Sequence, residues 1–111
     1  MTDCIFCNIV AKNIPSETVY EDDKVAVIKD IFPKAPVHLL VLSKEHVGSI
    51  TDLKADHEPL LGHMILTAKD MAEKQGIAEN GYKLIFNVGR HGGQIVRHIH
   101  LHILGGKQLS E

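Results

Sequence analysis

The sequence of 111 residues has no tryptophan, only two cysteines and few aromatic residues, which make up 5% of the chain. Two cysteines do not form the disulfide framework of a small secreted domain. No apolar run approaches the roughly 20 residues that span a membrane. Residues 1–4 also lack the basic lead and apolar stretch of a secretion signal. We therefore expect a cytoplasmic protein with no membrane partner.

An excess of either charge is also missing. The chain holds 12 Lys and Arg against 14 Asp and Glu, a formal net charge of -2. This balance gives no electrostatic reason to expect a nucleic-acid partner. Hydrophobic residues make up 44% of the chain and charged residues 23%, values typical of a globular protein. Length and composition predict a single domain over residues 1–111 and exclude the disordered and fibrous classes.

Histidine, in contrast, is abundant, with eight in the chain. Histidine titrates near neutral pH and binds metals readily, so a high count indicates chemistry. His57 and His63 fall on a predicted helix and are expected to be structural, and His91 is expected to be solvated. The other five histidines are the candidates for a functional site.

Hydrophobic periodicity predicts two helices and five strands. Apolar positions within residues 4–12 recur as on a short helix, and those within residues 58–75 form one stripe along a long helix. Asp56 is expected to cap the long helix, with Pro59 in its first turn and Gly76 as its stop. The predicted strands cover residues 18–20, 25–28, 37–42, 82–87 and 97–104. This order predicts an α+β fold, a mostly antiparallel sheet covered by helix on one face.

Three histidines alternate with apolar residues in the segment from His98 to Leu104, His-Ile-His-Leu-His-Ile-Leu. Alternate side chains of a strand point to opposite faces, so His98, His100 and His102 share one face. They could be solvated polar residues on an open face. They could also be metal ligands, although a flat strand spreads ligands too far to converge on one ion. We favour nucleophilic catalysis on phosphorus, because a neutral imidazole nitrogen can form a covalent intermediate.

A glycine-rich loop directly precedes these histidines. Residues 88–95 include Gly89, Gly92 and Gly93, and glycines let backbone N–H groups approach phosphate oxygens closely. Such a loop alone is a weak indication. Joined to the histidine segment, it favours a phosphate-binding site.

The alternating histidine segment resembles the motif of the histidine triad (HIT) family. Residues 30–31, 33–38, 61–63 and 92–94, together with Gly105-Gly106, resemble the histidine triad nucleotide-binding (Hint) branch of that family. The similarity runs from about residue 4 to residue 106 and implies a HIT-like fold. Members of this branch are homodimeric phosphoramidases that release an amine from a purine nucleoside 5'-monophosphoramidate. The resemblance therefore implies a purine nucleotide substrate, AMP as product and a homodimer.

The resemblance also implies roles for individual residues. His100 would attack the α-phosphorus and form a nucleotidyl-histidine intermediate, which water then hydrolyses. His102 would contact phosphate oxygens, His38 would support the nucleophile from the neighbouring strand, and His98 would lie at the base of the triad. The implied substrate-binding residues are Asp30 at the ribose hydroxyls, Asn87, Gly93 and Gln94 at the phosphate, and Ile5, Phe6, Ile9, Ile28 and Ile31 in an apolar purine slot. For the five apolar residues, spacing alone favours plain core.

Two features depart from the branch. It commonly carries a serine that donates to the phosphate where this chain has Ile95, so one phosphate donor is missing. It also often has a longer C-terminal tail that reaches the partner's site, whereas this sequence stops at Glu111. A leaving-group preference is therefore not carried over from the branch.

Cys4 and Cys7 form a C-x-x-C pair. A redox pair of this kind follows a strand, for which there is no room before Cys4. A structural zinc site needs four ligands, of which this pair supplies two. Some HIT relatives hold zinc with such a pair plus two histidines, and the matching positions are His46 and His98. The resemblance implies a structural zinc ion as cofactor, with none required for catalysis; two thiols without metal are the alternative.

Two alternatives to phosphoramidate hydrolysis stay open. A dinucleoside polyphosphate hydrolase of the same family would share the triad but attack a P–O–P link. A non-catalytic nucleotide- or zinc-binding protein would keep the fold without the activity. The intact triad argues against this alternative, because binding alone does not need a nucleophile. From the family likeness we expect a homodimer formed through the long helix and the strand of residues 82–87, with Leu66 and Leu84 available for the interface.

Overall fold

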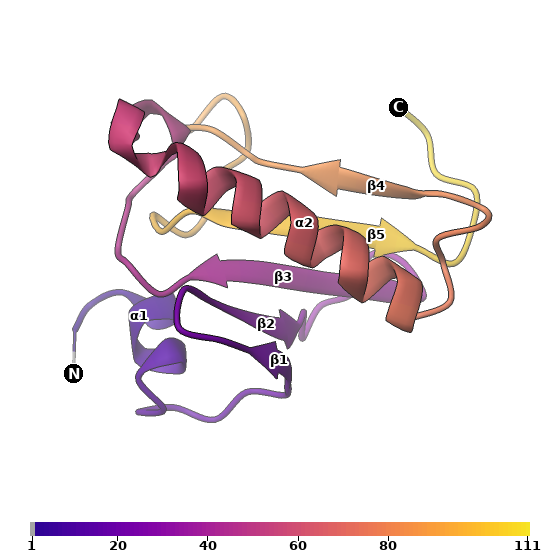
Figure 1. Ribbon diagram of the computed structural model, residues 1–111, viewed down its shortest axis with the longest axis horizontal. Helices are drawn as coiled ribbons and strands as arrows, with labels where there is room; N and C mark the ends of the chain where they lie inside the picture. Colours follow the sequence, from indigo (N-terminus) through magenta and orange to yellow (C-terminus); the bar gives the residue numbers. More distant parts are fainter. Residues whose placement is uncertain (1) are drawn as a thin grey trace.

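The computed structural model describes residues 2–111 (Figure 1). Its elements are helices α1 (Ile5–Val10) and α2 (Glu58–Lys74), strands β1 (Thr18–Glu21), β2 (Val25–Lys29), β3 (Val37–Ser43), β4 (Tyr82–Ile85) and β5 (His100–Gly105), and 3-10 turns at Ile50–Asp52 and Ala55–His57. The predicted α+β class, with five strands, one long helix and one short helix, is confirmed. Neither helix of the described chain has the length and apolar character needed to cross a membrane.

The five strands form one antiparallel sheet in the order β1-β2-β3-β5-β4. The register of β3 and β5 places Leu40 opposite His102 and Leu42 opposite His100. Residues directly opposite each other point to the same face. His38, two residues before Leu40, joins them there because side chains alternate along a strand. One face of the sheet, called the histidine face below, therefore carries three histidines.

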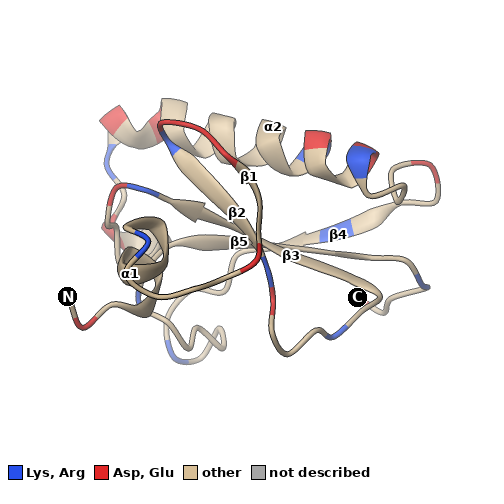
Figure 2. Ribbon diagram, turned by 90° about the horizontal axis from the view of Figure 1, so that it is seen from below, with Lys and Arg blue, Asp and Glu red and all other residues tan. Residues whose placement is uncertain are grey.

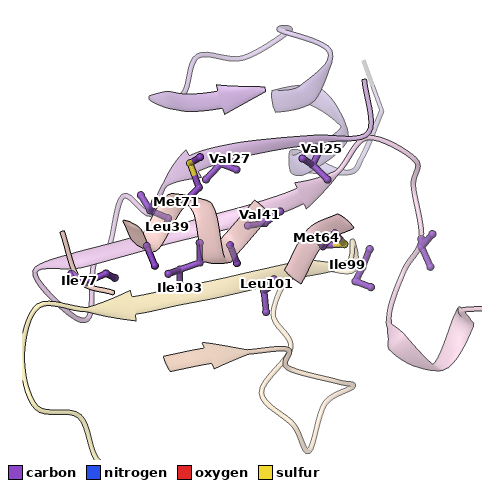
Figure 3. Packing of buried hydrophobic residues seen from close by; sticks show 13 residues of the cluster. Val25, Val27, Leu39, Val41, Met64, Met71, Ile77, Ile99, Leu101 and Ile103 are labelled. Atoms are coloured by element: carbon purple, nitrogen blue, oxygen red, sulfur yellow. The ribbon is translucent and has the colours of Figure 1, made fainter. Parts of the chain in front are cut away.

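Helix α2 covers the opposite face, called the apolar face below (Figure 1). Met64, Ala68, Met71 and Ala72 of α2 are buried there against alternate residues of the strands. The strand and loop residues of this core are Val25, Val27, Leu39, Val41, Val47, Ile77, Ile99, Leu101 and Ile103 (Figure 3). The helical stripe expected from the sequence is thus confirmed as the side of α2 that faces the core, except that Ile65 is 45% exposed.

The C-terminal end of α2 lies where the sequence predicts it, but the residue that caps the N-terminal end does not. Pro59 lies in the first turn, as expected. Gly76 follows the helix with a φ of 75°, a left-handed conformation that glycine adopts without strain. The expected cap at Asp56 is wrong, because His57 occupies the N-cap position. Residues 55–57 form a 3-10 turn that leads directly into the helix, so Asp56 lies inside that turn.

Helix α1 lies on the other side of the sheet, against the histidine face. Figure 2 shows α2 on one side of the sheet and α1, with the loops of residues 30–36 and 86–99, on the other. A second, smaller core fills the space between α1 and the sheet, formed by Phe6, Ile9, Ile28, Leu40 and Leu42. Because His100 is only 8% exposed and His98 is fully buried, an open face with three solvated histidines is excluded.

The last strand begins later than the sequence predicts. β5 starts at His100, not at residue 97. His98 lies in a bend, where its N–H donates to the carbonyl of Val96 at 2.9 Å, while Ile99 donates to Val47 at 2.7 Å. The chain turns into the sheet only after these bonds. His98 is therefore placed apart from the other two triad histidines.

Candidate active site

His100 is held by the backbone two residues before it. Its Nδ1 lies 2.7 Å from the carbonyl oxygen of His98. A carbonyl only accepts, so Nδ1 carries the proton and Nε2 the lone pair. Among residues 2–111, Ser49 Oγ is the one fully enclosed side-chain polar atom without a hydrogen-bond partner. The Nε2 of His100, which has no partner among these residues either, is therefore not fully enclosed.

The backbone also fixes the proton of His38. The amide of Lys34 donates to His38 Nδ1 at 3.1 Å, so the proton of this ring is on Nε2. That atom lies 3.0 Å from His102 Nδ1 and 3.4 Å from Asp30 Oδ2. His102 accepts on Nδ1 and keeps its own proton on Nε2. The rings of His100 and His102 are 5.0 Å apart, so a nucleophilic nitrogen and an N–H donor lie side by side.

Burial lowers the pKa of His38, His98, His100 and His102. Loss of hydration is the main cause for His98 and His100, and their hydrogen bonds to backbone carbonyls oppose it. Burial also lowers the pKa of His38, although the carboxylate of Asp30 opposes the shift. The pKa of His102 falls to about 4, by burial first and then by the neighbouring His100 and His38. At neutral pH these rings are neutral, the state in which an imidazole is a nucleophile.

Asp30 follows β2 and lies beside His38. Its Oδ1 accepts the amide of Phe32 at 2.8 Å, which forms a tight turn. Its Oδ2 faces His38 Nε2. A carboxylate offers about four lone-pair positions, so further donors can bind. The fold thus brings Asp30 to the triad, and its ribose-binding role stays a prediction.

The glycine-rich loop is closed on itself. The amide of Gly93 donates to Arg90 at 3.1 Å and that of Gln94 to Gly89 at 3.0 Å. The side chain of Gln94 accepts from the Gly89 amide at 3.0 Å and donates to the Gly48 carbonyl at 2.7 Å. These bonds attach the loop to the segment after β3. The amides of Gly93 and Gln94, predicted to bind phosphate, are therefore already occupied.

Two other groups of this loop bear on phosphate binding. Asn87 donates its side-chain amide to the Gly92 carbonyl at 2.8 Å and so braces the loop. The backbone amide of Ile95 has no protein partner in the described part of the chain, and its side chain is 93% exposed. The position where the branch carries a serine thus still offers a backbone donor.

The five apolar residues predicted for a purine slot separate into two groups. Phe6, Ile9 and Ile28 are buried in the second core. Ile5 and Ile31 are 48% and 80% exposed. The first three support the histidine face from within, and only the last two are free to contact a base.

Cys4, Cys7, His46 and His98 converge on one point, and their ligand atoms all lie within 4.8 Å of one another. Cys4 Sγ lies 3.3 Å from His98 Nδ1, and His46 Nδ1 lies 3.2 Å from both Cys7 Sγ and His98 Nδ1. Such separations are close to the edges of a tetrahedron with metal bonds of about 2.0–2.3 Å. His98 donates its Nε2–H to the Ser43 carbonyl at 2.7 Å, so its Nδ1 lone pair faces the cluster. The donor set fits zinc.

A second group of possible ligands, Asp30, His38 and His102, is equally close together but does not fit a metal. The Lys34 amide occupies the lone pair of His38 Nδ1. The proton is therefore on Nε2, the atom that faces the other two residues. An ion bound to Nε2 would force the His38 proton onto Nδ1, where it would point at the Lys34 N–H.

Sequence reasoning missed two residues of this site, Ser43 and Lys34. Ser43 holds His98 through its carbonyl, and Lys34 holds His38 through its amide. Every residue type except proline supplies both groups, so no side-chain signal marks these positions. Only the register of β3 and the turn before it bring them to the rings.

Comparisons with known proteins agree with this fold. A family model described as "Scavenger mRNA decapping enzyme C-term binding" matches residues 3–111. The chain is 49% identical over 108 residues to the purine nucleoside phosphoramidase of Escherichia coli (strain K12), which covers 97% of this chain and 91% of that protein. It is 47% identical over 105 residues to protein HitA of Neisseria gonorrhoeae, a match that covers 95% of this chain and 97% of that protein.

Solved structures show the same likeness. A HIT family hydrolase from Legionella pneumophila superposes with a TM-score of 0.96 at 44% identity, covering 97% of this chain and 96% of that one. A histidine triad protein from Clostridium difficile gives the same TM-score at 40% identity, and the match covers 100% of this chain and 96% of that one. The chain belongs to the histidine triad (HIT) family.

Proposed function

We propose that this protein hydrolyses purine nucleoside 5'-monophosphoramidates, or related adenylates, through a covalent nucleotidyl-histidine. The observation that carries the proposal is the state of His100. Its Nδ1 proton is bound to a backbone carbonyl, and its free Nε2 is not fully enclosed. The similarity to a relative named purine nucleoside phosphoramidase supports the choice of substrate.

The reaction has two displacements at phosphorus. His100 Nε2 forms a bond to the α-phosphorus, and the amine leaves with the electron pair of the P–N bond and takes a proton from water. A positive charge develops on the ring, and the Nδ1–H bond to the His98 carbonyl stabilises it. Water then attacks phosphorus, the bond to Nε2 breaks, and the mononucleotide leaves, AMP in the case of adenosine. The His102 Nε2–H and the Ile95 amide are the donors for phosphate oxygens.

A direct experiment compares two substrates and three proteins. Wild type should hydrolyse adenosine 5'-monophosphoramidate faster than a diadenosine polyphosphate. His100→Ala should lose activity by about 10³-fold or more, as expected for a nucleophile. His91→Ala is the matched control, because His91 is an exposed histidine of the same region.

Each contrary result identifies another function. Preference of wild type for the polyphosphate would favour the alternative activity of the family. Nucleotide binding without hydrolysis of either substrate would favour a binding protein. Equal turnover by wild type and His100→Ala would remove His100 from its assigned role.

We further propose that Cys4, Cys7, His46 and His98 hold one structural zinc ion. The tetrahedral separations and the free lone pair of His98 Nδ1 support this. Zinc would link α1 to the loops before α2 and β5. Metal-ligating thiols persist in a reducing compartment, so the cytoplasmic location is part of the same proposal.

Metal analysis of protein purified without added zinc tests the site. About one zinc per chain is expected, and Cys4→Ser with Cys7→Ser should abolish it. Less than about 0.2 zinc per chain with both thiols reduced would contradict a one-to-one structural site. A stoichiometry of two would contradict the argument that Asp30, His38 and His102 do not bind metal.

We propose a homodimer formed through β4 and the adjacent flank of α2. In the part of the chain that the structure describes, β4 pairs with β5 alone, so its outer edge makes no strand pairing. Leu84 on β4 is 37% exposed and Ile65 on α2 is 45% exposed. Leu66, which the sequence analysis also offered for the interface, is placed elsewhere. It lines a cavity of about 600 Å³ between α2 and β1, at the opposite edge of the sheet.

Light scattering at micromolar concentration should give twice the 12.3 kDa of one chain. Leu84→Lys should give monomers, because a charge would be buried at the interface. Leu66→Lys is the matched control, and it should stay dimeric. A wild type of 12.3 kDa, or dissociation by Leu66→Lys alone, would contradict this interface.

A further inference from the structure

His98 belongs to two sites at once. Its side chain faces Cys4, Cys7 and His46, with Nδ1 3.2–3.5 Å from their ligand atoms. Its backbone carbonyl accepts the Nδ1–H of His100 at 2.7 Å. Any movement of His98 in the cluster therefore moves the group that fixes the proton of His100.

Phe6 is a second connection between the same two sites. It lies in α1 between Cys4 and Cys7 and is 7% exposed. Its ring meets the His98 ring edge-on at a centroid distance of 5.9 Å and the His100 ring at 4.9 Å. The contact with His100 is the closer one. It limits how far the nucleophile can rotate.

The position of Phe6 depends in turn on what holds α1. The helix has only six residues, with no acidic residue in its first turn and no basic residue in its last. A helix this short is not stable by itself. Cys4 is its N-cap, and Cys4 Sγ accepts the amide of Cys7 at 3.3 Å. The two thiols that would bind the ion are thus also the residues that start the helix.

We propose that the cysteine–histidine cluster controls the orientation of the nucleophile, with His98 and Phe6 as positioning residues. This rests on the proposed function and on zinc occupancy of the cluster. With zinc bound, the His98 carbonyl and the Phe6 ring hold His100 with its proton on Nδ1 and Nε2 free. Without zinc, the sheet and α2 stay folded, because the larger core does not include these residues, but His100 exchanges between tautomers and orientations.

The test reads the tautomer directly, without substrate. Ring-nitrogen NMR at one pH above the titration range would compare zinc-loaded wild type, chelator-stripped wild type, Cys7→Ser and Phe6→Leu. The loaded protein should show a single Nδ1-protonated His100, and the other three should show a mixture. In parallel, kcat should fall about 10–100-fold, the usual cost of losing such outer contacts, with KM changed less than about 3-fold.

Val10→Ala is the matched control, because Val10 lies in α1 and packs against the second core but makes no ring contact with a histidine. It should keep the single tautomer. A stripped, folded wild type with the same Nδ1-protonated His100 and the same kcat as the loaded protein would overturn the proposal. If Cys7→Ser fails to fold, the comparison of stripped with loaded wild type still tests whether zinc fixes the His100 tautomer. Because the NMR result needs no turnover, failure of phosphoramidate hydrolysis would be seen separately.

Discussion

The two faces of the central strands β3 and β5 are stabilised in different ways. On the apolar face, Leu39, Val41, Leu101 and Ile103 are at most 2% exposed and pack beneath α2. On the histidine face, His38 has a partner at both ring nitrogens, whereas His100 has one at Nδ1 and keeps Nε2 free. Apolar packing depends on volume and shape, and is tolerant of similar side chains. Fixing a neutral imidazole in one tautomer depends on single backbone groups. It is therefore not tolerant of other side chains or of small shifts of those groups.

The largest expected change in stability comes from the apolar face. Leu101 is 1% exposed, so Leu101→Ala should cost about 2–5 kcal/mol of unfolding free energy through lost burial and an unfilled cavity. Urea denaturation measures this. Leu101→Met, which conserves volume, should cost less than about 1.5 kcal/mol. The folded fraction of both variants should keep the wild-type kcat, and a selective loss of kcat would contradict the separation of the two faces.

Asp22 provides a polar anchor at the edge of the apolar side. Its carboxylate accepts from His63 of α2 at 2.7 Å, from the Tyr20 hydroxyl at 2.8 Å and from the amides of Lys24 and Val25. Burial raises the pKa of Asp22, but these hydrogen bonds outweigh it and hold the pKa well below its usual range. Asp22→Asn should therefore cost about 1–3 kcal/mol at pH 7.

The sign of the pH effect follows from the depressed pKa. The stabilisation by Asp22 is present above its unfolded pKa of about 3.9 and is lost as the pH falls below it. Wild type should lose this increment in urea unfolding between pH 5 and the acid range, while Asp22→Asn should not. Asp23→Asn, at the exposed neighbouring position, is expected to change stability by less than about 0.5 kcal/mol. Equal stability of wild type and Asp22→Asn at pH 7 would remove Asp22 as an anchor.

The smallest expected effect is a pH dependence that belongs to the histidine face. The pKa of His102 is about 4 in the folded protein against about 6.5 in an unfolded chain. The unfolded chain then binds more protons between these values, so the stabilisation is complete above pH 6.5 and is lost as the pH falls toward 4. The slope contributed by one proton is at most about 1.4 kcal/mol per pH unit. His102→Asn should flatten the slope of unfolding free energy between pH 6.5 and 5, whereas Leu101→Met should leave it unchanged.

Periodic patterns predicted most of this fold because they report burial directly. The apolar stripe of α2 and the alternating histidines of residues 98–104 repeat over several turns or residues, and the long helix and the two central strands lie where expected. The start of β5 and the cap of α2 do not, because they depend on hydrogen bonds of Val47 and on a 3-10 turn at residues 55–57. Single hydrogen bonds of this kind leave no periodic trace in a sequence.

The sequence by itself determined that three histidines alternate over five residues after a glycine-rich loop, because side-chain types and their spacing are local properties. Only the tertiary structure decided which nitrogen of His98, His100 and His38 carries the proton. Those choices are made by the carbonyls of Ser43 and His98 and the amide of Lys34. Backbone groups are the same at nearly every position, so their effect depends on where the fold places them.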